Sequence, residues 1–440
     1  MNWSQARKWL SPVIVAGSFL AGERTHHHED TQYQLHKYQL IDFEDIIEDT
    51  KDKIMQKMVE AHIPGSCCIV HVDGRPVMKA GFGFSDVENC TPFTCKTSMR
   101  IASISKLITA LMTVNLAQEG KVDLNDNLVE LLKSNQIQLT VGNEEVDCLT
   151  IKELLSHTAG VRHYHEADEG GGDSTAQEFF SSRNYPTVKH GLQMFINDKL
   201  LFKPGSEYKY TTFGYSLLSF ILEKCSGKSF EQLLSDFTSK LGLPHTRLDS
   251  FEDIILNRCQ YYCKSDKGKL KNCPYVDNSC KWAGGGMVST AEDIAKLGDI
   301  LLYLYQSESS DNYVNKESLQ SMIEFNPVTG TERAGLKSHY GYGVRVFHEQ
   351  QSHGKTAQYL KLSHNGGAIG ASSTVLVLPL GNQGNQGNQG NQGTPRGITV
   401  VMLSNSLEGD VVRLAHEIAA SFAERIENGG DCCEQLYGLV

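Results

Sequence analysis

Apolar and polar positions along the chain follow helical and strand periods in turn. Residues 43–61 place isoleucine, methionine and valine side chains on one side and charges on the other, which predicts an amphipathic helix. Residues 66–72 and 75–80 are strand-like and flank Asp73-Gly74, a pair typical of a two-residue hairpin turn. Residues 81–84 continue the second strand, and their glycines allow another backbone to approach closely. The N-terminal part therefore predicts a helix followed by a β-hairpin.

The rest of the chain divides into a helical middle and a strand-rich C-terminal part. Residues 103–300 are mainly helical and rich in loops, with surface helices predicted over 173–200 and 229–240. Strands return in the C-terminal part, at residues 340–347, 359–364, 372–378 and 398–404, and an amphipathic helix from about 410 to 426 follows them. Strands from both ends must then share one sheet, with the helical middle inserted between them, which predicts an α/β fold.

These elements divide the chain into consecutive segments. They are a targeting segment and linker (1–42), the first part of a sheet domain (43–100), a mainly helical subdomain (101–300), the second part of the sheet domain (301–427) and a tail (428–440). Residues 381–393 repeat Gly-Asn-Gln and have nothing to bury, so we expect a disordered hairpin insertion there. An aggregation-prone polar tract is the alternative for this repeat.

Length and charge narrow the class of protein. A chain of 440 residues with 40% hydrophobic residues is long enough for one large core or two interlocked cores. Lys and Arg number 41 against 52 Asp and Glu, for a net charge of −11, and no basic run is longer than two residues. This balance argues against nucleic acid as a partner. No apolar stretch reaches the roughly 18 residues of a membrane span.

The N-terminus has the composition of a targeting segment. Residues 1–22 contain Arg7 and Lys8, no acid before Glu23, and an apolar stretch. This pattern fits a cleaved mitochondrial or secretory signal. Asn89-Cys90-Thr91 would be a glycosylation acceptor in a secreted protein, or a chance match.

Cysteine usage leaves several interpretations open. Of twelve cysteines, Cys259, Cys263, Cys273 and Cys280 fall in one segment, with spacings that match no zinc knuckle. A metal site, disulfides and unpaired structural thiols remain alternatives. Cys67-Cys68 is expected in the core, and Cys432-Cys433, in the polar tail, could be reactive or intermolecular. His26-His27-His28 could bind a metal weakly or belong to a solvated linker.

The sequence Ser103-Ile104-Ser105-Lys106 stands where a buried helix is predicted to begin. A helix there puts Lys106 on the same face as Ser103, one turn later. Free N–H groups at a helix start favour a developing anion, and a desolvated lysine can lose its proton and activate a hydroxyl. The alternative is that Ser103 serves only as a helix cap.

Further motifs in the right order make the chain resemble the superfamily of serine β-lactamases (class C) and penicillin-binding proteins. S-x-x-K is the nucleophile motif of that superfamily. Tyr210-Thr211-Thr212 resembles its Y-x-N motif, and His364-Asn365-Gly366-Gly367 resembles its K-T-G strand in the H-x-G form. Residues 154–160 resemble its LLSHTSG segment. Residues 161–164 and 274–286 look like its animal mitochondrial branch. The resemblance covers roughly residues 43–425.

The resemblance implies a fold and a set of roles. The fold is an antiparallel sheet flanked by helices, with an inserted helical subdomain that carries the nucleophile. Ser103 would be the nucleophile, Lys106 its base and Tyr210 a proton relay to the leaving group. The backbone N–H groups of Ser103 and Gly367 would form the oxyanion hole. Asn365 and Gly366 belong to the same substrate-binding strand, and neither a metal nor a cofactor is implied.

Two positions depart from the family pattern. Thr212 replaces the amide of Y-x-N, and a hydroxyl cannot offer two donors to a substrate carbonyl. His364 replaces the cation of K-T-G, and imidazole, with a free pKa of about 6.5, is mostly neutral at pH 7. Both changes predict weak or no hydrolysis of β-lactams and favour substrates without a carboxylate at that place. A packing role beside the strand is the alternative for His364.

Nearby histidines and glycines also have two interpretations. His157, His163 and His165 could form a metal or acid–base set, but the histidine of S-H-T-A-G is expected to hydrogen-bond its turn. Trp282 and residues 284–286 could line the site wall or form a structural turn.

Two functions from different classes follow from the resemblance. The first is a serine hydrolase that forms an acyl-enzyme and cleaves peptide, amide or ester bonds. The alternative is a filament-forming structural protein of the mitochondrial intermembrane space that affects lipid metabolism. Retention of Ser103, Lys106 and Tyr210 favours catalysis, because a scaffold needs none of them. We expect a homo-oligomer located in mitochondria, in the intermembrane space, with secretion as the alternative.

Overall fold

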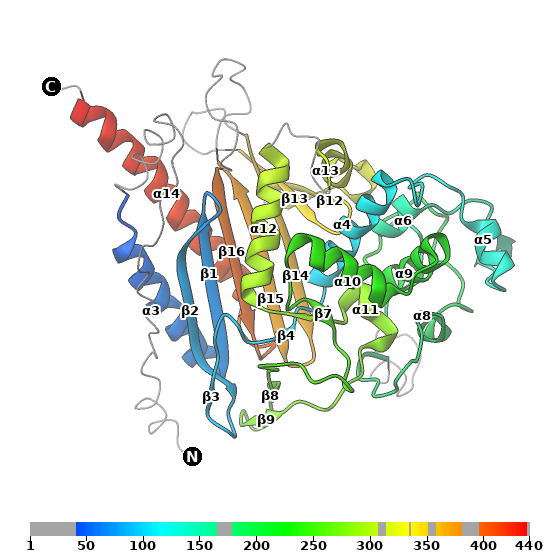
Figure 1. Cartoon of the computed structure of the whole chain (residues 1–440), viewed down its shortest axis with the longest axis horizontal. Coiled ribbons are helices and arrows are strands. Elements are labelled where there is room, and N and C mark those ends of the chain that lie inside the picture. Colours follow the sequence, from blue (N-terminus) through cyan, green and yellow to red (C-terminus); the bar gives the residue numbers. More distant parts are fainter. Residues whose placement is uncertain are drawn as a thin grey trace.

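The computed structural model mixes helices and strands around one large antiparallel sheet (Figure 1). It describes residues 41–164, 178–306, 314–333, 336–350, 358–380 and 396–437. The strand order is β11-β12-β13-β14-β15-β16-β1-β2-β3. Its N-terminal strands are β1 (Gly65–Val72), β2 (Arg75–Asp86) and β3 (Thr91–Pro92). Its C-terminal strands are β11 (Thr331–Arg333), β12 (Leu336–Tyr340), β13 (Arg345–Gln350), β14 (Gln358–Ala368), β15 (Ala371–Pro379) and β16 (Gly397–Ser404).

Strands from the two ends of the chain meet at β1. The β1–β2 hairpin turns at Asp73 and Gly74, whose φ angles of 52° and 71° suit a two-residue turn of type I′. On its other edge β1 pairs with β16, from Ser66 opposite Ser404 to Val72 opposite Ile398. The predicted sharing of one sheet by both ends is therefore confirmed.

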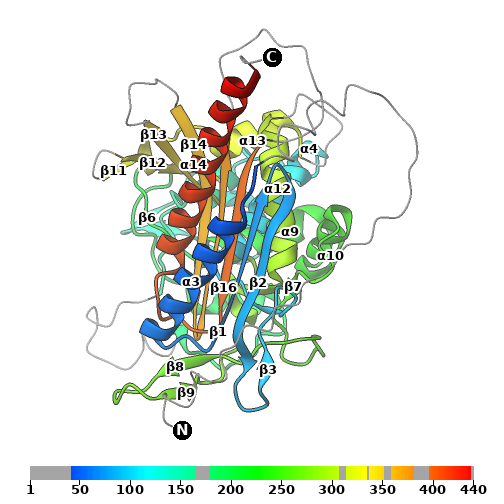
Figure 2. The same ribbon diagram turned by 90° about the vertical axis from the view of Figure 1, so that its left-hand side faces the viewer.

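Helices cover both faces of this sheet. The helices α3 (Glu44–Ala61) and α14 (Val411–Tyr437) lie across one face (Figure 2), and α12 (Ala291–Gln306) packs on the other. Alternate residues of β1 enter the two cores: Cys68 and Val70 face α3 and α14, whereas Cys67 and Ile69 join the core under the helical part. Burial on both faces explains why β1 is an unbroken, mostly apolar run.

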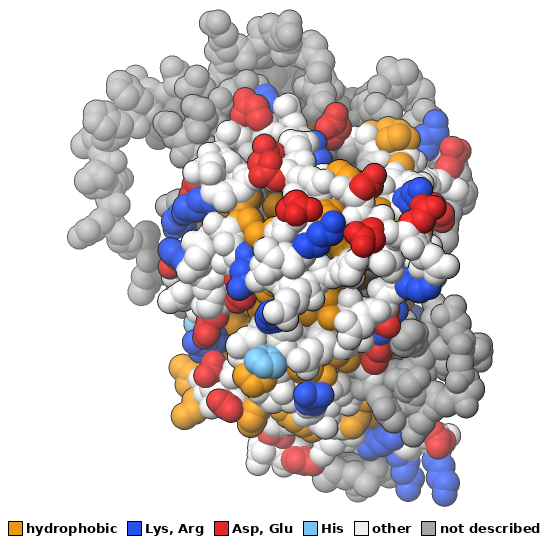
Figure 3. All heavy atoms as spheres, turned by 90° about the vertical axis from the view of Figure 1, so that its right-hand side faces the viewer, with side chains coloured by type: hydrophobic (Ala, Val, Ile, Leu, Met, Phe, Trp, Pro, Cys, Tyr) orange, Lys and Arg blue, Asp and Glu red, His pale blue; other side chains and the backbone are white. Residues whose placement is uncertain are grey.

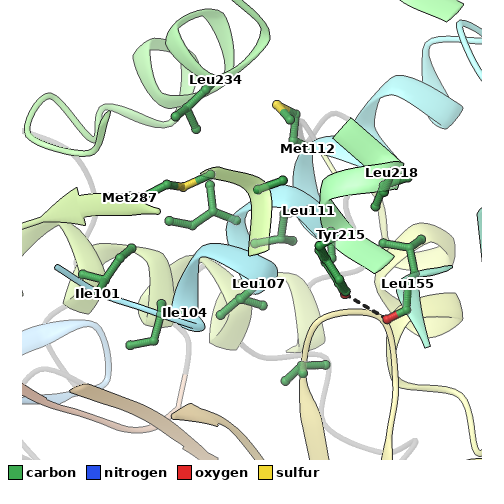
Figure 4. Packing of buried hydrophobic residues seen from close by; sticks show 14 of the residues in the cluster. Ile101, Ile104, Leu107, Leu111, Met112, Leu155, Tyr215, Leu218, Leu234 and Met287 are labelled. Carbon is green, nitrogen blue, oxygen red and sulfur yellow. Dashed lines mark hydrogen bonds between the residues drawn. The ribbon is translucent and has the colours of Figure 1, made fainter. Parts of the chain in front are cut away.

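The helical part lies beside the sheet and carries the larger core. Its helices are α4 (Ile104–Gln118), α5 (Val129–Ser134), α6 (Ile151–Leu155), α8 (Val188–Gly191), α9 (Phe213–Ser226), α10 (Phe230–Leu241), α11 (Trp282–Gly285) and α13 (Lys316–Ile323), with 3-10 turns η1 (Leu192–Met194), η2 (Ser279–Lys281) and η3 (Pro327–Thr329). Short strands connect them: β4 (Met99–Arg100), β5 (Thr140–Val141), β6 (Glu144–Glu145), β7 (Arg247–Leu248), β8 (Tyr262–Lys264), β9 (Leu270–Asn272) and β10 (Met287–Ser289). In its core the hydroxyl of Tyr215 donates to the carbonyl oxygen of Leu155 at 2.8 Å (Figure 4).

Two predicted elements are wrong. The strand predicted over 340–347 is two strands, β12 and β13, separated by a turn. A methyl group on Gly341 would lie 1.9 Å from the carbonyl oxygen of Met322, and Gly343 has a φ of 67°, so both glycines make this turn. The surface helices predicted over 173–200 are only partly present: among the described residues of this region, the helical backbone is confined to 178–179, α8 and η1.

Tertiary contacts explain the missing helix. The backbone N–H of Tyr185 donates to Ser279 Oγ at 2.8 Å, and the Asn184 side chain donates to Asp277 at 3.1 Å. These contacts hold the segment before α8 in an irregular path along the chain that leads into η2. The other surface helix, predicted over 229–240, is confirmed as α10.

The last helix is longer than predicted. The predicted amphipathic pattern ends at Ile426, which is buried, and the helical backbone continues to Tyr437. Predictions for residues 1–22, His26-His27-His28, His165 and the repeat at 381–393 lie outside the described residues, as do the side chains of Cys432 and Cys433.

The described cysteines are free thiols in different surroundings. Cys67 and Cys68 are fully buried in β1, as predicted. Of the clustered set, Cys259 and Cys280 are buried, whereas Cys263 and Cys273 are partly exposed and interact with each other at the β8–β9 hairpin. Among the three alternatives for this set, the structure has unpaired thiols.

One face of the molecule carries charges of both signs. On the side of the molecule away from α3 and α14, acidic and basic side chains are interspersed, with apolar groups visible between them (Figure 3). Within the described part of the chain, no helix combines the length and the apolar character that crossing a bilayer requires.

Candidate active site

Ser103 stands at the start of α4, next to a strained residue. Ala102 has a φ of 47°, in the left-handed region that residues with a side chain seldom adopt. Ser103 is the capping residue of α4, but its hydroxyl makes no capping hydrogen bond. Instead Ser103 Oγ lies 3.2 Å from Lys106 Nζ. The side chain therefore pairs with the lysine, and the capping interpretation does not describe it.

Lys106 is completely buried, with 0% of its surface exposed. Its ammonium nitrogen also contacts Thr212 Oγ1 at 3.2 Å and the carbonyl oxygen of Gly284 at 2.5 Å. No carboxylate of the described residues forms an ion pair with it. Burial, and then the positive charge of Lys281, hold the pKa of Lys106 well below its usual range. A buried lysine without a counter-ion is suited to act as a base at neutral pH.

Tyr210 faces the same pair of residues. Lys106 Nζ lies 4.7 Å from the centre of the Tyr210 ring, which packs against the His157 ring at 4.4 Å between centroids. Burial raises the pKa of Tyr210, and a hydrogen bond with the Ser103 side chain opposes this effect. The phenol is therefore protonated at neutral pH and adjoins the nucleophile. The structure thus brings together Ser103, Lys106 and Tyr210.

Two histidines hold the Tyr210 segment in place. Nδ1 of His157 accepts a hydrogen bond from the backbone N–H of Thr211 at 3.3 Å, and Nδ1 of His163 accepts one from Thr212 at 3.2 Å. His157 was expected to bond its own turn, but its partner is the neighbouring segment. Burial lowers the pKa of both imidazoles, and Lys106 in its protonated form adds to this, so that the pKa of His163 falls to about 3. Both are neutral acceptors that position the segment.

His364 is also neutral, for a reason that the structure makes explicit. Its Nδ1 contacts the carbonyl oxygen of Asn365 at 2.9 Å, and its Nε2 contacts the hydroxyl of Tyr340 at 2.8 Å. Because a carbonyl oxygen only accepts, Nδ1 carries the proton and Nε2 accepts from Tyr340. Burial and the charge of Lys106 lower the pKa of His364 to about 3. The position that carries a cation in K-T-G is uncharged here.

The remaining residues of the H-x-G motif press β14 against the nucleophile turn. A methyl group on Gly366 would lie 2.3 Å from Ser373 Oγ and 2.4 Å from the carbonyl oxygen of Ile101, so only glycine fits. Ser373 Oγ in turn donates to that carbonyl at 2.8 Å. Asn365 and Gly367, on either side of Gly366 in the sequence, are exposed. Asn365 Oδ1 accepts a hydrogen bond from the Thr374 hydroxyl at 2.7 Å. The backbone N–H of Ser103 has no acceptor among the described residues.

Thr212 and Gly284 make the opposite wall. A methyl group on Gly284 would lie 2.7 Å from the carbonyl oxygen of Thr212, so the glycine lets α11 approach α9 closely. This approach directs the Gly284 carbonyl at Lys106. Of the two interpretations of the Trp282 segment, its glycines thus contribute to the site wall. The Thr212 hydroxyl is buried and occupied by Lys106.

Sequence reasoning missed two side chains of the site. Tyr340 was placed at the start of a strand, and nothing in its alternation indicates that its hydroxyl bonds His364. Lys281 lies within residues 274–286, for which the sequence predicts only a family resemblance. Its burial, with 6% of its surface exposed, could be suspected from the apolar and glycine residues that follow it.

The antiparallel sheet, the inserted helical part and the serine–lysine pair at the start of a buried helix define a serine hydrolase of the β-lactamase fold. The family model described as Beta-lactamase matches residues 50–423, and the chain belongs to this family. The serine beta-lactamase-like protein LACTB, mitochondrial, of Mus musculus is 32% identical over 450 residues, which cover 86% of this chain and 81% of that protein. The Homo sapiens protein of the same name is 32% identical over 440 residues, covering 86% and 79%.

Solved structures agree on the fold. An octameric penicillin-binding protein homologue from Pyrococcus abyssi superposes with a TM-score of 0.65 at 23% identity, covering 86% of this chain and 77% of that one. A D-stereospecific amidohydrolase from Streptomyces sp. gives a TM-score of 0.63 at 20% identity, with coverages of 84% and 98%. At these identities the likeness extends to the fold alone.

Proposed function

We propose that this protein is a serine hydrolase that forms an acyl-enzyme on Ser103, with Lys106 as the general base. The observation that carries the proposal is the contact of 3.2 Å between Ser103 Oγ and a fully buried Lys106 that has no carboxylate partner in the described chain. A lysine of lowered pKa can take the hydroxyl proton as Oγ attacks a carbonyl carbon. A cap or a packing residue would need neither the burial nor the unpaired charge.

The proton then has a route to the leaving group. Tyr210 stays protonated at neutral pH and neighbours both Ser103 and Lys106, so it can pass a proton from the lysine to the departing nitrogen or oxygen. The N–H of Ser103 and that of Gly367 are the proposed oxyanion donors. Two observations support this assignment. The Ser103 N–H has no acceptor among the described residues, and Gly366 lies close to the carbonyl oxygen of Ile101, just before Ser103.

The proposed substrate is a peptide, amide or ester without a carboxylate beside the scissile bond. His364 is neutral and both of its nitrogens are occupied, so it offers no charge to a carboxylate. The Thr212 hydroxyl already accepts a hydrogen bond from Lys106 Nζ. Weak or no β-lactamase activity follows, because penicillins carry such a carboxylate. The structural neighbours titled as a D-stereospecific amidohydrolase and a D-amino acid amidase are consistent with amide cleavage.

Covalent labelling tests this function. Purified protein and its Ser103→Ala variant would be treated with a fluorophosphonate and, separately, with a fluorescent penicillin, and the labelled peptide identified by mass spectrometry. We expect the fluorophosphonate on Ser103, no label in the variant, and much slower labelling by penicillin. Absence of any label on folded wild-type protein would contradict the proposal and favour a structural role.

The proposed setting is a homo-oligomer in mitochondria, in the intermembrane space. The LACTB relatives are named as mitochondrial proteins, and the archaeal homologue is titled as octameric. A filament that affects lipid metabolism stays the alternative role. Light scattering and electron microscopy of the purified chain test assembly, and monodisperse monomers at all concentrations would exclude it. Fractionation of cells that express the tagged chain tests its location.

A further inference from the structure

A second buried lysine lies behind the site. Lys281 ends η2, directly before α11, and has 6% of its surface exposed. Its Nζ lies over two aromatic rings, 5.4 Å from the centre of Tyr164 and 5.2 Å from that of Phe179. No hydrogen bond or ion pair to this ammonium exists within the described residues. Aromatic faces attract a cation, so the rings favour the charged form of Lys281 without neutralising it.

The two lysines lie on either side of one contact between helices. Tyr164 hydrogen-bonds Thr212 with its hydroxyl, and Thr212 Oγ1 contacts Lys106 Nζ. The helix α11, which begins directly after Lys281, provides the Gly284 carbonyl that also contacts Lys106. Tyr164, whose ring lies against the Lys281 ammonium, is therefore hydrogen-bonded to Thr212, and Thr212 contacts Lys106. The charge of Lys281 acts on Lys106 and, after burial, lowers its pKa, because two like charges with little water between them cannot both hold their protons easily.

The neighbours of each lysine decide which one gives up its proton. The titratable groups around Lys106 are the imidazoles of His157, His163 and His364 and the phenols of Tyr210 and Tyr215, all neutral at pH 7. The Arg345 guanidinium acts on the imidazoles of His157 and His364. Around Lys281 they are the phenol of Tyr164, which is neutral at pH 7, and Cys280, Arg100 and Asp249. Burial lowers the pKa of Lys281, and Cys280 and the Asp249 carboxylate oppose this effect. Burial and the Lys281 charge lower the pKa of Lys106 well below its usual range, and no acidic group opposes them.

We propose that Lys281 is a positioning residue whose ammonium keeps Lys106 in the neutral, basic form that accepts the Ser103 proton. This proposal rests on the proposed acyl-enzyme function. The charge of Lys281 would substitute, from the opposite wall, for the K-T-G cation that is missing at His364. When Ser103 Oγ attacks, its proton moves to Lys106 Nζ and its electron pair forms the bond to the carbonyl carbon. The same repulsion then favours transfer of that proton onward to the leaving group.

The pH profile of fluorophosphonate labelling tests the proposal. Second-order labelling constants between pH 5 and 10 would be measured for the wild type and for Lys281→Met, Lys281→Gln and Lys281→Arg. We expect the midpoint of the acidic limb to rise by about one pH unit or more in the Met and Gln variants, with labelling about tenfold slower below it. The Arg variant keeps the charge and should keep the limb. Lys209→Met, at an exposed lysine near His163, is the matched control and should not move it.

A readout that does not need activity separates the two proposals. The ¹³Cε resonance of Lys106, assigned by its loss in Lys106→Arg, can be titrated in lysine-labelled protein with and without Lys281→Met. An unchanged titration and an unchanged acidic limb in folded variants would overturn the role of Lys281 while Ser103 labelling still stands. Failure of the wild type to label would overturn the proposed function, and the titration would still decide the role of Lys281. Removing an unpaired buried charge should not prevent folding, which circular dichroism checks.

Discussion

The hydroxyl of Tyr340 donates a hydrogen bond to Nε2 of His364, and this contact fixes the imidazole as a neutral group. The other ring nitrogen is occupied by the carbonyl oxygen of Asn365. The motif position that carries a cation in K-T-G is therefore uncharged here. The contact explains in atomic terms why a substrate carboxylate is not expected to bind there.

Replacing this histidine by a cation should change the preference between probes. We expect His364→Lys to raise the rate of labelling by fluorescent penicillin, relative to fluorophosphonate, by about tenfold or more, because a charge-assisted hydrogen bond to the penicillin carboxylate becomes possible. His364→Gln, which is uncharged, is the control and should leave the ratio of the two rates unchanged. An equal ratio in the Lys variant and the wild type would show that other groups limit penicillin recognition.

Stability should fall in mild acid because three imidazoles are held neutral. The pKa values of His163 and His364 are lowered to about 3, and that of His157 is lowered well below its usual value, mainly by burial. Below the free value of about 6.5, the unfolded chain binds protons that the folded chain does not, so stability rises with pH and is lost as pH falls from about 6.5 towards 3.

Urea unfolding as a function of pH measures this effect. Near pH 4.5 we expect these groups to contribute close to three protons taken up on unfolding, and His163→Gln should lower the uptake by about one. A midpoint that stays constant from pH 7 to pH 4.5 would show that the folded protein protonates these rings.

Neighbouring glycines of β14 should respond differently to the same change. In Gly366→Ala the new methyl group would meet Ser373 Oγ at 2.3 Å and the Ile101 carbonyl at 2.4 Å, whereas in Gly367→Ala the nearest atom is a Leu407 methyl at 3.4 Å. We expect a loss of about 3 kcal/mol in the free energy of unfolding for the first variant and less than about 1 kcal/mol for the second. Thermal unfolding of both variants tests this, and equal stabilities would contradict the close contact of β14 with the nucleophile turn.

The hydroxyl of Tyr215 is expected to matter for stability. Tyr215→Phe leaves the buried carbonyl of Leu155 without its donor, which typically costs about 1–3 kcal/mol. Tyr275 has 53% of its surface exposed, so Tyr275→Phe should stay within about 0.5 kcal/mol of the wild type. Urea unfolding of the two variants compares them, and a neutral Tyr215→Phe would mean that the carbonyl finds another donor.

Much of the fold could be predicted because its strands are bounded by local signals. Asp73-Gly74 fixes the first hairpin, and the apolar run of β1 marks a strand buried on both faces. Ser103 and Lys106 stand at the start of a predicted buried helix, and the family resemblance assigned roles to them and to Tyr210. Such signals lie within a few residues and can be seen in the sequence.

What the sequence did not reveal depends on partners far along the chain. Tyr340 was predicted to continue a strand, yet the chain turns after it because Gly341 meets the backbone of Met322. The segment before α8 lost its predicted helix to hydrogen bonds with Ser279 and Asp277. Lys281 becomes part of the site only when α11 packs against α4 and α9. None of these contacts has a local sequence pattern.

The position of β1 between β2 and β16 has a consequence during synthesis. The hydroxyl of Ser66 donates to the carbonyl of Leu403, 337 residues further along, so one edge of β1 stays without its partner until the end of the chain is available. Contacts of such sequence separation form late and slowly. The turn before Ser103 is braced by Ser373 and Gly366, which also belong to that end. If Ser103 is the nucleophile we propose, a growing chain would therefore carry no activated serine until its C-terminal strands are available.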